Sequence, residues 1–351
     1  MEKIGYTYKI KDSPATTSAE LAGVISDEIG AGKLRFDTAV TTKTTTATLN
    51  VNEAGTILCS AAGGAYTITL PTAVGNTGLT YHFKKTDANY TLITIDGDGT
   101  ETINYENSTS APALTYTRLN TYCAEVTMVS DGSNWQVISE ALGQVPDMWA
   151  HSSISIYDLT NGQDSYIILN SETTDIGSNF EYSTLISGTA DGTVTDHLQD
   201  DTASPFTAAM DGRRVHNTTD DTYAWINTYN DAGDVTLSAD IFEDGEAYTI
   251  SQSKFVAPIA GKYRIQIGYR WWNTVETGYC TNMYYKNGAI DEMSAVRGTG
   301  GTIAHSLISY TSLAATNYIE PLASCGGGNT VDLLGGASTR IWMKITLVSK
   351  T

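Results

Sequence analysis

Hydrophobic and polar side chains alternate with a period of two along much of this chain. Residues 66–71 alternate strictly and end at a proline, and residues 262–267 place Tyr and Ile between Lys, Arg and Gln. Alternation of this kind is typical of β-strands with one buried and one solvated face. Residues 92–103 and 126–138 each hold two such stretches around an Asp-Gly turn, which predicts a β-hairpin. We therefore predict an all-β, multidomain fold built from antiparallel β modules.

Residues 1–35 follow a different pattern. Ser18 is placed to cap a short helix in which Leu21, Val24 and Ile29 recur at helical spacing. The segment is too short to fold independently, so we predict a short N-terminal arm that orders against a partner or a neighbouring subunit. A frayed terminus is the alternative.

Residues 36–141 are predicted to form one β module. Between Leu70 and Trp135 the sequence runs LPTA, HFKK, IDGDG and SDGSNW in that order. This order of turns resembles the β modules of bacteriophage tail and head fibres, and it implies a structural protein of a virion. Residues 142–148 are predicted to be a linker, because Gly143 and Pro146 interrupt the strand pattern.

Three stretches of the last hundred residues carry a second resemblance. FVAPIAGKY begins at Phe255, MYYKNG at Met283 and IWMKITL at Ile341. They resemble strands of the jelly roll found in complement globular heads and tumour necrosis factor, although residues 313–331 depart from that pattern with a longer Gly-rich stretch. The resemblance implies a C-terminal jelly-roll sandwich.

The same resemblance implies a homotrimer, because these jelly rolls pack three around an axis. We expect the trimer face to draw on four residues or on their strand neighbours: Tyr263, Ile265, Trp342 and Ile345.

Residues 187–251 interrupt the predicted jelly roll. In that family the opening strands lead directly into the Phe-x-Ala-Pro stretch, whereas here a segment intervenes that resembles a small β module of phage structural proteins. We predict a jelly roll made of residues 149–186 and 252–351, with 187–251 inserted as a cassette. Insertions are tolerated where the ends of a loop lie close together. A linear series of domains is the alternative.

The charge of the chain limits the classes of partner that it is expected to bind. The net charge is −19, which disfavours binding to nucleic acid or to anionic membranes. No apolar run approaches membrane length, and residues 1–10 lack the apolar core of an export signal. We therefore expect no nucleic acid partner, no membrane insertion and a virion protein assembled in the host cytoplasm.

Few residues suggest metal or redox chemistry. The four cysteines are far apart and are predicted to be buried free thiols, with Cys280 and Cys325 the one pair worth testing for a bridge. Asp96, Asp98 and Glu101 offer oxygen atoms at the spacing of a calcium loop, but the same Asp-Gly pairs are needed for a tight turn. No cofactor and no catalytic residue are predicted.

An aromatic cluster offers a candidate ligand surface. Amphipathic rings suit the faces of sugars. Core packing is the alternative, because neighbouring residues of a strand point to opposite faces and one of the two adjacent tryptophans should be buried. The candidates are Tyr269, Trp271, Trp272, Tyr279 and Tyr285.

These patterns together favour a non-enzymatic function. We expect a trimeric phage fibre or spike, docked on a capsid or tail protein by its N-terminal arm and attaching to a glycan or protein of the host surface. A head fibre or capsid decoration protein with a stabilising role is the alternative. A polysaccharide depolymerase is less favoured, since it requires regular β-helix rungs or a defined carboxylate pair.

Overall fold

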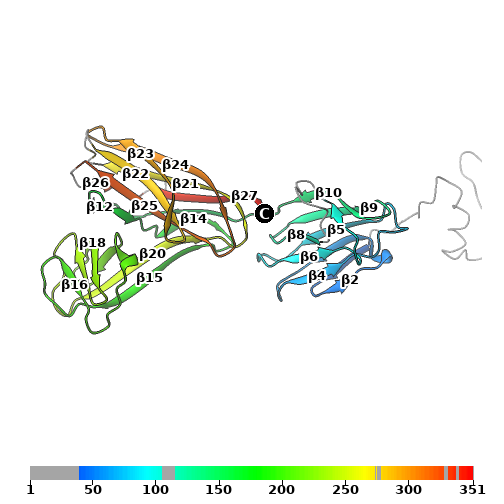
Figure 1. The fold of residues 1–351 in the computed structure, drawn as a ribbon, viewed down its shortest axis with the longest axis horizontal. Helices are drawn as coiled ribbons and strands as arrows, with labels where there is room; N and C mark the ends of the chain where they lie inside the picture. The colour runs from blue at the N-terminus through cyan, green and yellow to red at the C-terminus, as the bar shows by residue number, and fades with distance from the viewer. Residues whose placement is uncertain are drawn as a thin grey trace, which may run out of the picture.

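The structure is a computed structural model that describes residues 39–104, 115–272, 274, 278–327, 331–336 and 340–350 (Figure 1). The predicted N-terminal arm, residues 1–35, lies outside the described residues. Within them the secondary structure consists of β-strands and two short 3₁₀ helices, so the all-β prediction is confirmed. The described part of the chain contains no helix long and apolar enough to cross a membrane.

The first module packs two sheets over one core that includes Tyr81, Phe83 and Trp135. The six-stranded sheet has, in spatial order, β1 (Ala39–Lys43), β3 (Gly55–Cys59), β5 (Thr80–Lys85), β9 (Glu125–Ser130), β10 (Trp135–Ala141) and β7 (Ile103–Asn104). The four-stranded sheet has β2 (Ala47–Thr48), β4 (Tyr66–Thr69), β6 (Ile93–Asp96) and β8 (Thr115–Leu119), and the 3₁₀ helix η1 is Val51–Glu53.

The chain of this module winds between its two sheets. Strands β1, β3 and β5 pair in parallel in one sheet, and β2, β4 and β6 pair in parallel in the other. The predicted hairpin at residues 126–138 is confirmed as the antiparallel pair β9 and β10. The predicted hairpin at residues 92–103 is wrong, because β6 and β7 lie in different sheets. Side-chain alternation is the same in both arrangements and does not distinguish them.

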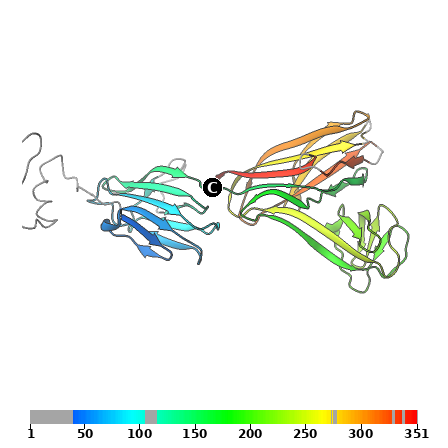
Figure 2. The same ribbon diagram turned by 180° about the vertical axis from the view of Figure 1, so that it is seen from behind.

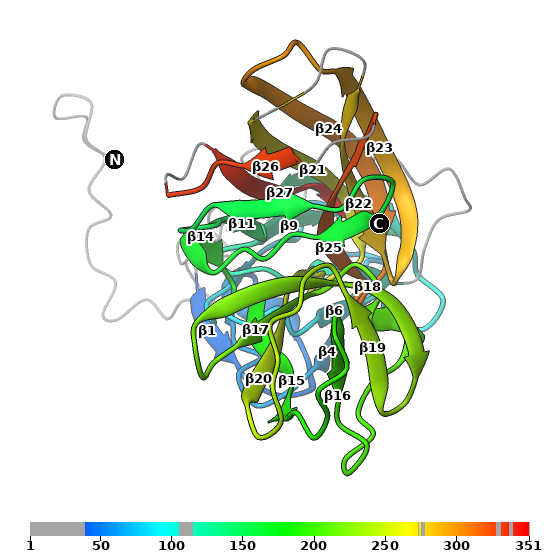
Figure 3. The same cartoon turned by 90° about the vertical axis from the view of Figure 1, so that its left-hand side faces the viewer.

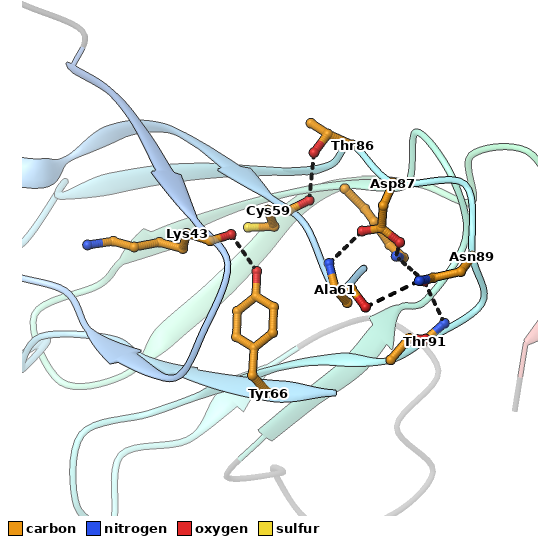
Figure 4. Close-up of polar contacts among 9 residues, drawn as sticks. Lys43, Cys59, Ala61, Tyr66, Thr86, Asp87, Asn89 and Thr91 are labelled. Carbon is orange, nitrogen blue, oxygen red and sulfur yellow. Dashed lines mark hydrogen bonds and ion pairs between the residues drawn. The ribbon is translucent and has the colours of Figure 1, made fainter. Parts of the chain in front are cut away.

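A buried ion pair lies at one end of the first module. The Lys85 side chain is fully buried and its ammonium group pairs with Asp87 and donates to Asn89 Oδ1 at 3.0 Å. Figure 4 shows how Asp87 and Asn89 also hold Ala61, whose amide donates to Asp87 Oδ2 at 2.6 Å. Burial lowers the pKa of Lys85, and Asp87 opposes that shift. The carboxylate therefore keeps an otherwise costly charge inside the fold.

The second part of the chain is a sandwich of two larger sheets. The first sheet has β12 (Ile156–Leu159), β26 (Val331–Leu333), β21 (Gly261–Trp272), β27 (Ile341–Lys350), β11 (Asp147–His151), β14 (Ser171–Ile176) and β24 (Ile303–Leu313), the last paired with β21. The second sheet has β16 (His197–Gln199), β19 (Asp234–Leu237), β18 (Thr222–Asp231), β17 (Arg214–Asn217), β20 (Ala247–Val256), β25 (Tyr318–Gly326), β22 (Tyr279–Lys286) and β23 (Ala289–Arg297), together with β13 (Asp164–Tyr166) and β15 (Phe180–Thr189). The 3₁₀ helix η2 is Ala208–Met210.

The strand order of this sandwich is that of a jelly roll. Strands β11-β27-β21-β24 form one layer and β20-β25-β22-β23 the other. Both layers contribute to one core, in which Tyr263 and Ile345 from the first meet Phe255, Tyr284 and Ile319 from the second. The two layers are visible in Figures 1 and 2.

Residues between β15 and β20 form a smaller unit with its own core, which includes Leu198, Val215 and Val235. We call the part of the chain from Ala190 to Glu246 the cassette. Strands β15 and β20 pair from Phe180 opposite Phe255 to Thr189 opposite Ala247. The chain thus leaves and re-enters the jelly roll through two adjacent strands, and the limits expected at residues 187 and 251 fall inside them.

Two buried side chains tie the cassette to the jelly roll. Arg213 donates to Glu320 Oε1 at 2.9 Å, both side chains are nearly inaccessible, and the guanidinium lies 4.0 Å from the ring centroid of Tyr166. Trp225 packs in the jelly-roll core and donates to the Tyr157 carbonyl at 3.1 Å. In Figure 3, which views the end carrying the cassette, β16 to β19 lie beneath the strands of the jelly roll.

Candidate functional site

The aromatic candidates do not form one surface. Tyr269 and Trp271 are 2% and 0% exposed, and the Trp271 indole donates to Asn282 Oδ1 at 3.0 Å inside the sandwich. Their assignment to a ligand surface is wrong, because alternation directs both rings into the core. Trp272 is 43% exposed, so the prediction that one of the two adjacent tryptophans is buried is confirmed.

Two further candidates lie apart from these. Tyr279 is 50% exposed and its ring covers Gly326, where an added Cβ would meet the ring at 2.3 Å. Tyr285 is half-buried, packs edge-on against Tyr166 and donates to Asp164 Oδ2 at 3.0 Å. Tyr279 thus keeps an accessible ring, whereas Tyr285 is engaged in packing.

Three of the four residues expected at a trimer face are core residues. Tyr263, Ile265 and Ile345 are all 0% exposed in the single chain, so they have no surface to offer a partner. Trp342 is half-buried and points away from the core, over Gly268. Tyr263, Ile265 and Ile345 are therefore excluded from such a face, whereas Trp342 and the strand neighbours, which the prediction also allowed, face solvent.

These neighbours make up what we call the outer sheet face, on the side of β11, β27, β21 and β24 opposite the core. Cross-strand pairing places Tyr310 beside Arg264, and Ile308 beside Gln266. Ile308 and Tyr310 are 52% and 55% exposed. The face consists of Trp149, Lys262, Arg264, Gln266, Ile308, Tyr310, Trp342, Lys344 and Thr346.

The outer sheet face holds polar atoms without partners. Arg264 Nε and Trp149 Nε1 are buried and form no hydrogen bond within the described residues. Lys262 and Lys344 lie 5.8 and 6.0 Å from the ring centroids of Tyr310 and Trp149. Buried donors without acceptors cost about 1–3 kcal/mol each. The face therefore combines exposed apolar area, cations and unsatisfied donors.

A cavity of about 680 Å³ lies where the cassette meets the jelly roll, and we call it the cassette pocket. One wall is the β12 segment with Tyr157 and Asp158, and the other is the hairpin of β17 and β18 with Arg214, Tyr223 and Trp225. None of these residues stands out in the sequence as a candidate site residue. Their one local signature is the pair of alternating motifs Arg-x-His and Tyr-x-Trp on either side of a turn.

The candidate calcium ligands Asp96, Asp98 and Glu101 belong to the turn after β6 and its hydrogen bonds. Glu101 accepts hydrogen bonds from Thr72 Oγ1 at 2.6 Å and from the Ala73 amide at 2.7 Å. An added Cβ at Gly97 would meet the Glu101 carbonyl at 2.3 Å, so the turn requires glycine there. Asp96 belongs to β6 and Asp98 accepts from the Glu101 amide at 3.0 Å through its carbonyl. No group of three metal-ligating side chains exists among the described residues.

Replacing Glu101 by alanine should lower the free energy of unfolding by about 1–2 kcal/mol, because three donors lose a charged acceptor. Urea denaturation of both chains, with and without millimolar calcium, measures the effect. We expect the same loss in both buffers. A loss confined to the calcium buffer would instead indicate that the carboxylate binds the ion.

Cys280 and Cys325 lie opposite each other on β22 and β25 and are both free thiols. Burial raises the pKa of Cys280 to about 12 and that of Cys325 to about 11. Cys59 is also free and buried, and Cys123 is free and half-buried. The prediction of free thiols therefore holds, and it is the protonated thiols that pack in the core.

Comparison with known proteins leaves the family open. No family model matches the sequence, and no curated protein matches it. Among solved structures, the chain is similar to the Eiger TNF from S. frugiperda at 9% identity, over 28% of this chain and 66% of that chain, with a TM-score of 0.22. The alignment spans less than two thirds of that chain, and a likeness at this score decides nothing about fold or function.

Proposed function

We propose that this chain is a non-enzymatic structural protein of a virus particle, a fibre or spike that works as a homotrimer and attaches to a host surface. The observation that carries the proposal is the outer sheet face. The proposal that the protein belongs to a virus particle rests on the sequence resemblance of residues 36–141. The proposal that it is a trimer rests on the sequence resemblance of the C-terminal strands. A head fibre with a stabilising role is the alternative, and imaging the protein on its particle separates the two.

The outer sheet face favours a second copy of the chain as its cover. Ile308 and Tyr310 together form an apolar centre, which is the kind of surface that protein interfaces bury. The cations around it lie on a chain of net charge −19, so the acidic surface of another copy is electrostatically complementary.

Light scattering during size-exclusion chromatography tests this proposal. The full chain at micromolar concentration should have about three times the 37.6 kDa mass of one chain. Replacing Ile308 by aspartate should reduce the mass to that of one chain, because three buried carboxylates at the interface cost far more than the contacts gain. Circular dichroism should remain that of a β protein, since Ile308 is exposed in the single chain.

Ile138→Asp is the matched control. Ile138 is 60% exposed and lies on β10 of the first module, away from the outer sheet face. This variant should keep the trimer mass. A single-chain mass for the unmodified protein, or an unchanged mass for Ile308→Asp, would contradict the proposal. Digestion of a polysaccharide by the purified chain would favour the depolymerase alternative.

A further inference from the structure

The cassette pocket contains a cation without a counter-ion. Arg214 lies opposite Trp225 on the β17–β18 hairpin, and its guanidinium is 4.1 Å from the ring centroid of Tyr223. No carboxylate among the described residues forms an ion pair with it. Burial lowers the pKa of Arg214, and the nearby Tyr223 and Asp158 oppose that shift. A planar guanidinium held on an aromatic ring, with its N–H groups unclaimed, is ready to donate to a ligand.

The pocket also offers aromatic faces. Tyr157 and Tyr223 are 49% and 38% exposed, on opposite walls. Trp225 is 2% exposed and closes the floor, fixed by its hydrogen bond to the Tyr157 carbonyl. The ring of His216 stacks on Tyr223 at 4.2 Å with an interplanar angle of 5°, which holds the tyrosine in place. Rigid rings of this kind stack on apolar faces of a ligand at low entropic cost.

Acceptors complete the lining. Asp158 and Asp221 are exposed and sit at positive φ, 56° and 61°, a conformation that fixes where each side chain projects. The Asp158 amide is held by Asp332 Oδ1 at 2.9 Å, and Asp221 accepts from His216 Nε2 at 2.8 Å. The cavity lining thus holds two carboxylates and a guanidinium, which offer both acceptors and donors.

We propose that the cassette pocket binds a neutral, hydroxyl-rich sugar unit of a glycan. Sugar hydroxyls both donate and accept, and so match Asp158 on one wall and Arg214 and Asp221 on the other. The apolar face of a pyranose ring matches Tyr157, whereas His216 and Arg214 already lie against the ring of Tyr223. An acidic sugar is disfavoured, because two carboxylates line the pocket and the chain carries a net charge of −19. This inference names the ligand class for the attachment role and rests on that proposed function.

The test measures binding of the full chain to an array of oligosaccharides with neutral ends (glucose, galactose, mannose, N-acetylglucosamine) and acidic ends (sialic acid, uronic acids). We expect binding to at least one neutral class. Affinity for that glycan, measured by calorimetry, should fall at least about tenfold in Tyr223→Ala and in Arg214→Lys, since the latter keeps the charge but loses the planar fork. Asp158→Asn, an exposed change that tolerates positive φ, should weaken binding several-fold without affecting folding.

Tyr279→Ala is the matched control, because Tyr279 is a 50%-exposed ring outside the pocket. It should bind like the unmodified chain. Loss of binding in Tyr279→Ala but not in Tyr223→Ala and Asp158→Asn would overturn the assignment to the pocket. Binding only to acidic ends, or to no glycan, would overturn the ligand class. The molecular mass of the same sample distinguishes failure of this inference from failure of the proposed function. A trimer that binds no glycan would contradict only the glycan site, and a single chain that binds glycan would contradict only the proposed trimer.

Discussion

Replacing Asp87 by alanine should lower the free energy of unfolding by about 3–5 kcal/mol, because it leaves the fully buried Lys85 ammonium without its counter-ion. The Ala61 amide loses its acceptor in the same change. Asn89 Oδ1, at 3.0 Å, remains as a neutral partner and does not replace a charge. Urea denaturation, combined with hydrogen exchange of β3 and β5, measures the loss in the full chain.

The destabilisation should shrink as the pH rises into the alkaline range. The pKa of Lys85 is already lowered by burial, so the unfolded chain binds more protons than the folded one between that pKa and the ordinary value. In that window stability rises with pH, and removing Asp87 extends the window to lower pH because it lowers the folded-state pKa of Lys85 further. The double variant Lys85→Met, Asp87→Asn should restore most of the loss. A cost for Asp87→Ala that is below about 1 kcal/mol and independent of pH would mean that water reaches Lys85.

Trp225→Ala should cost about 3–5 kcal/mol and should loosen the cassette before the jelly roll. The indole is 2% exposed and belongs to the jelly-roll core, although its strand belongs to the cassette. Its loss leaves a cavity at the junction and an unpaired Tyr157 carbonyl. Calorimetry should show a lower unfolding temperature, and hydrogen exchange should rise in β17 to β19 more than in β21 and β27.

Trp272→Ala provides the comparison, because this tryptophan is 43% exposed. Surface substitutions of this kind change stability by about 0.5 kcal/mol or less. Equal losses in the two variants would show that the Trp225 side chain does not tie the cassette to the jelly roll.

The sequence pattern located the strands of the jelly roll, but it did not identify which residues of each strand face solvent. Alternation at Tyr263 and Ile265 identified strand β21, but in a sandwich the apolar side of each strand faces inward. The outer sheet face is polar and cationic in sequence, and its apolar members Ile308 and Tyr310 alternate in phase with serines. Alternation alone therefore pointed to the core, and three of the four residues named from the resemblance, Tyr263, Ile265 and Ile345, lie in it.

Two features of the structure could not be predicted from local sequence patterns. The parallel strands β1, β3 and β5 begin at residues 39, 55 and 80, so no fixed repeat reveals the winding. The cassette pocket joins Tyr157 to Arg214 and Tyr223, which meet only because the cassette folds back on β12. Short-range alternation carries no information about such distant partners.

Because β15 and β20 are paired along their length, the cassette could be removed or replaced without breaking the strand pairing of the rest of the jelly roll. Thr184 and Ser251 lie opposite each other, so a tight turn joining them would close the jelly-roll chain with its remaining ladder in register. The shortened chain would keep the outer sheet face but would leave Glu320 as a lone charge, which a neutral residue at that position would remedy. The cassette could thus be exchanged at this junction while the outer sheet face stayed the same.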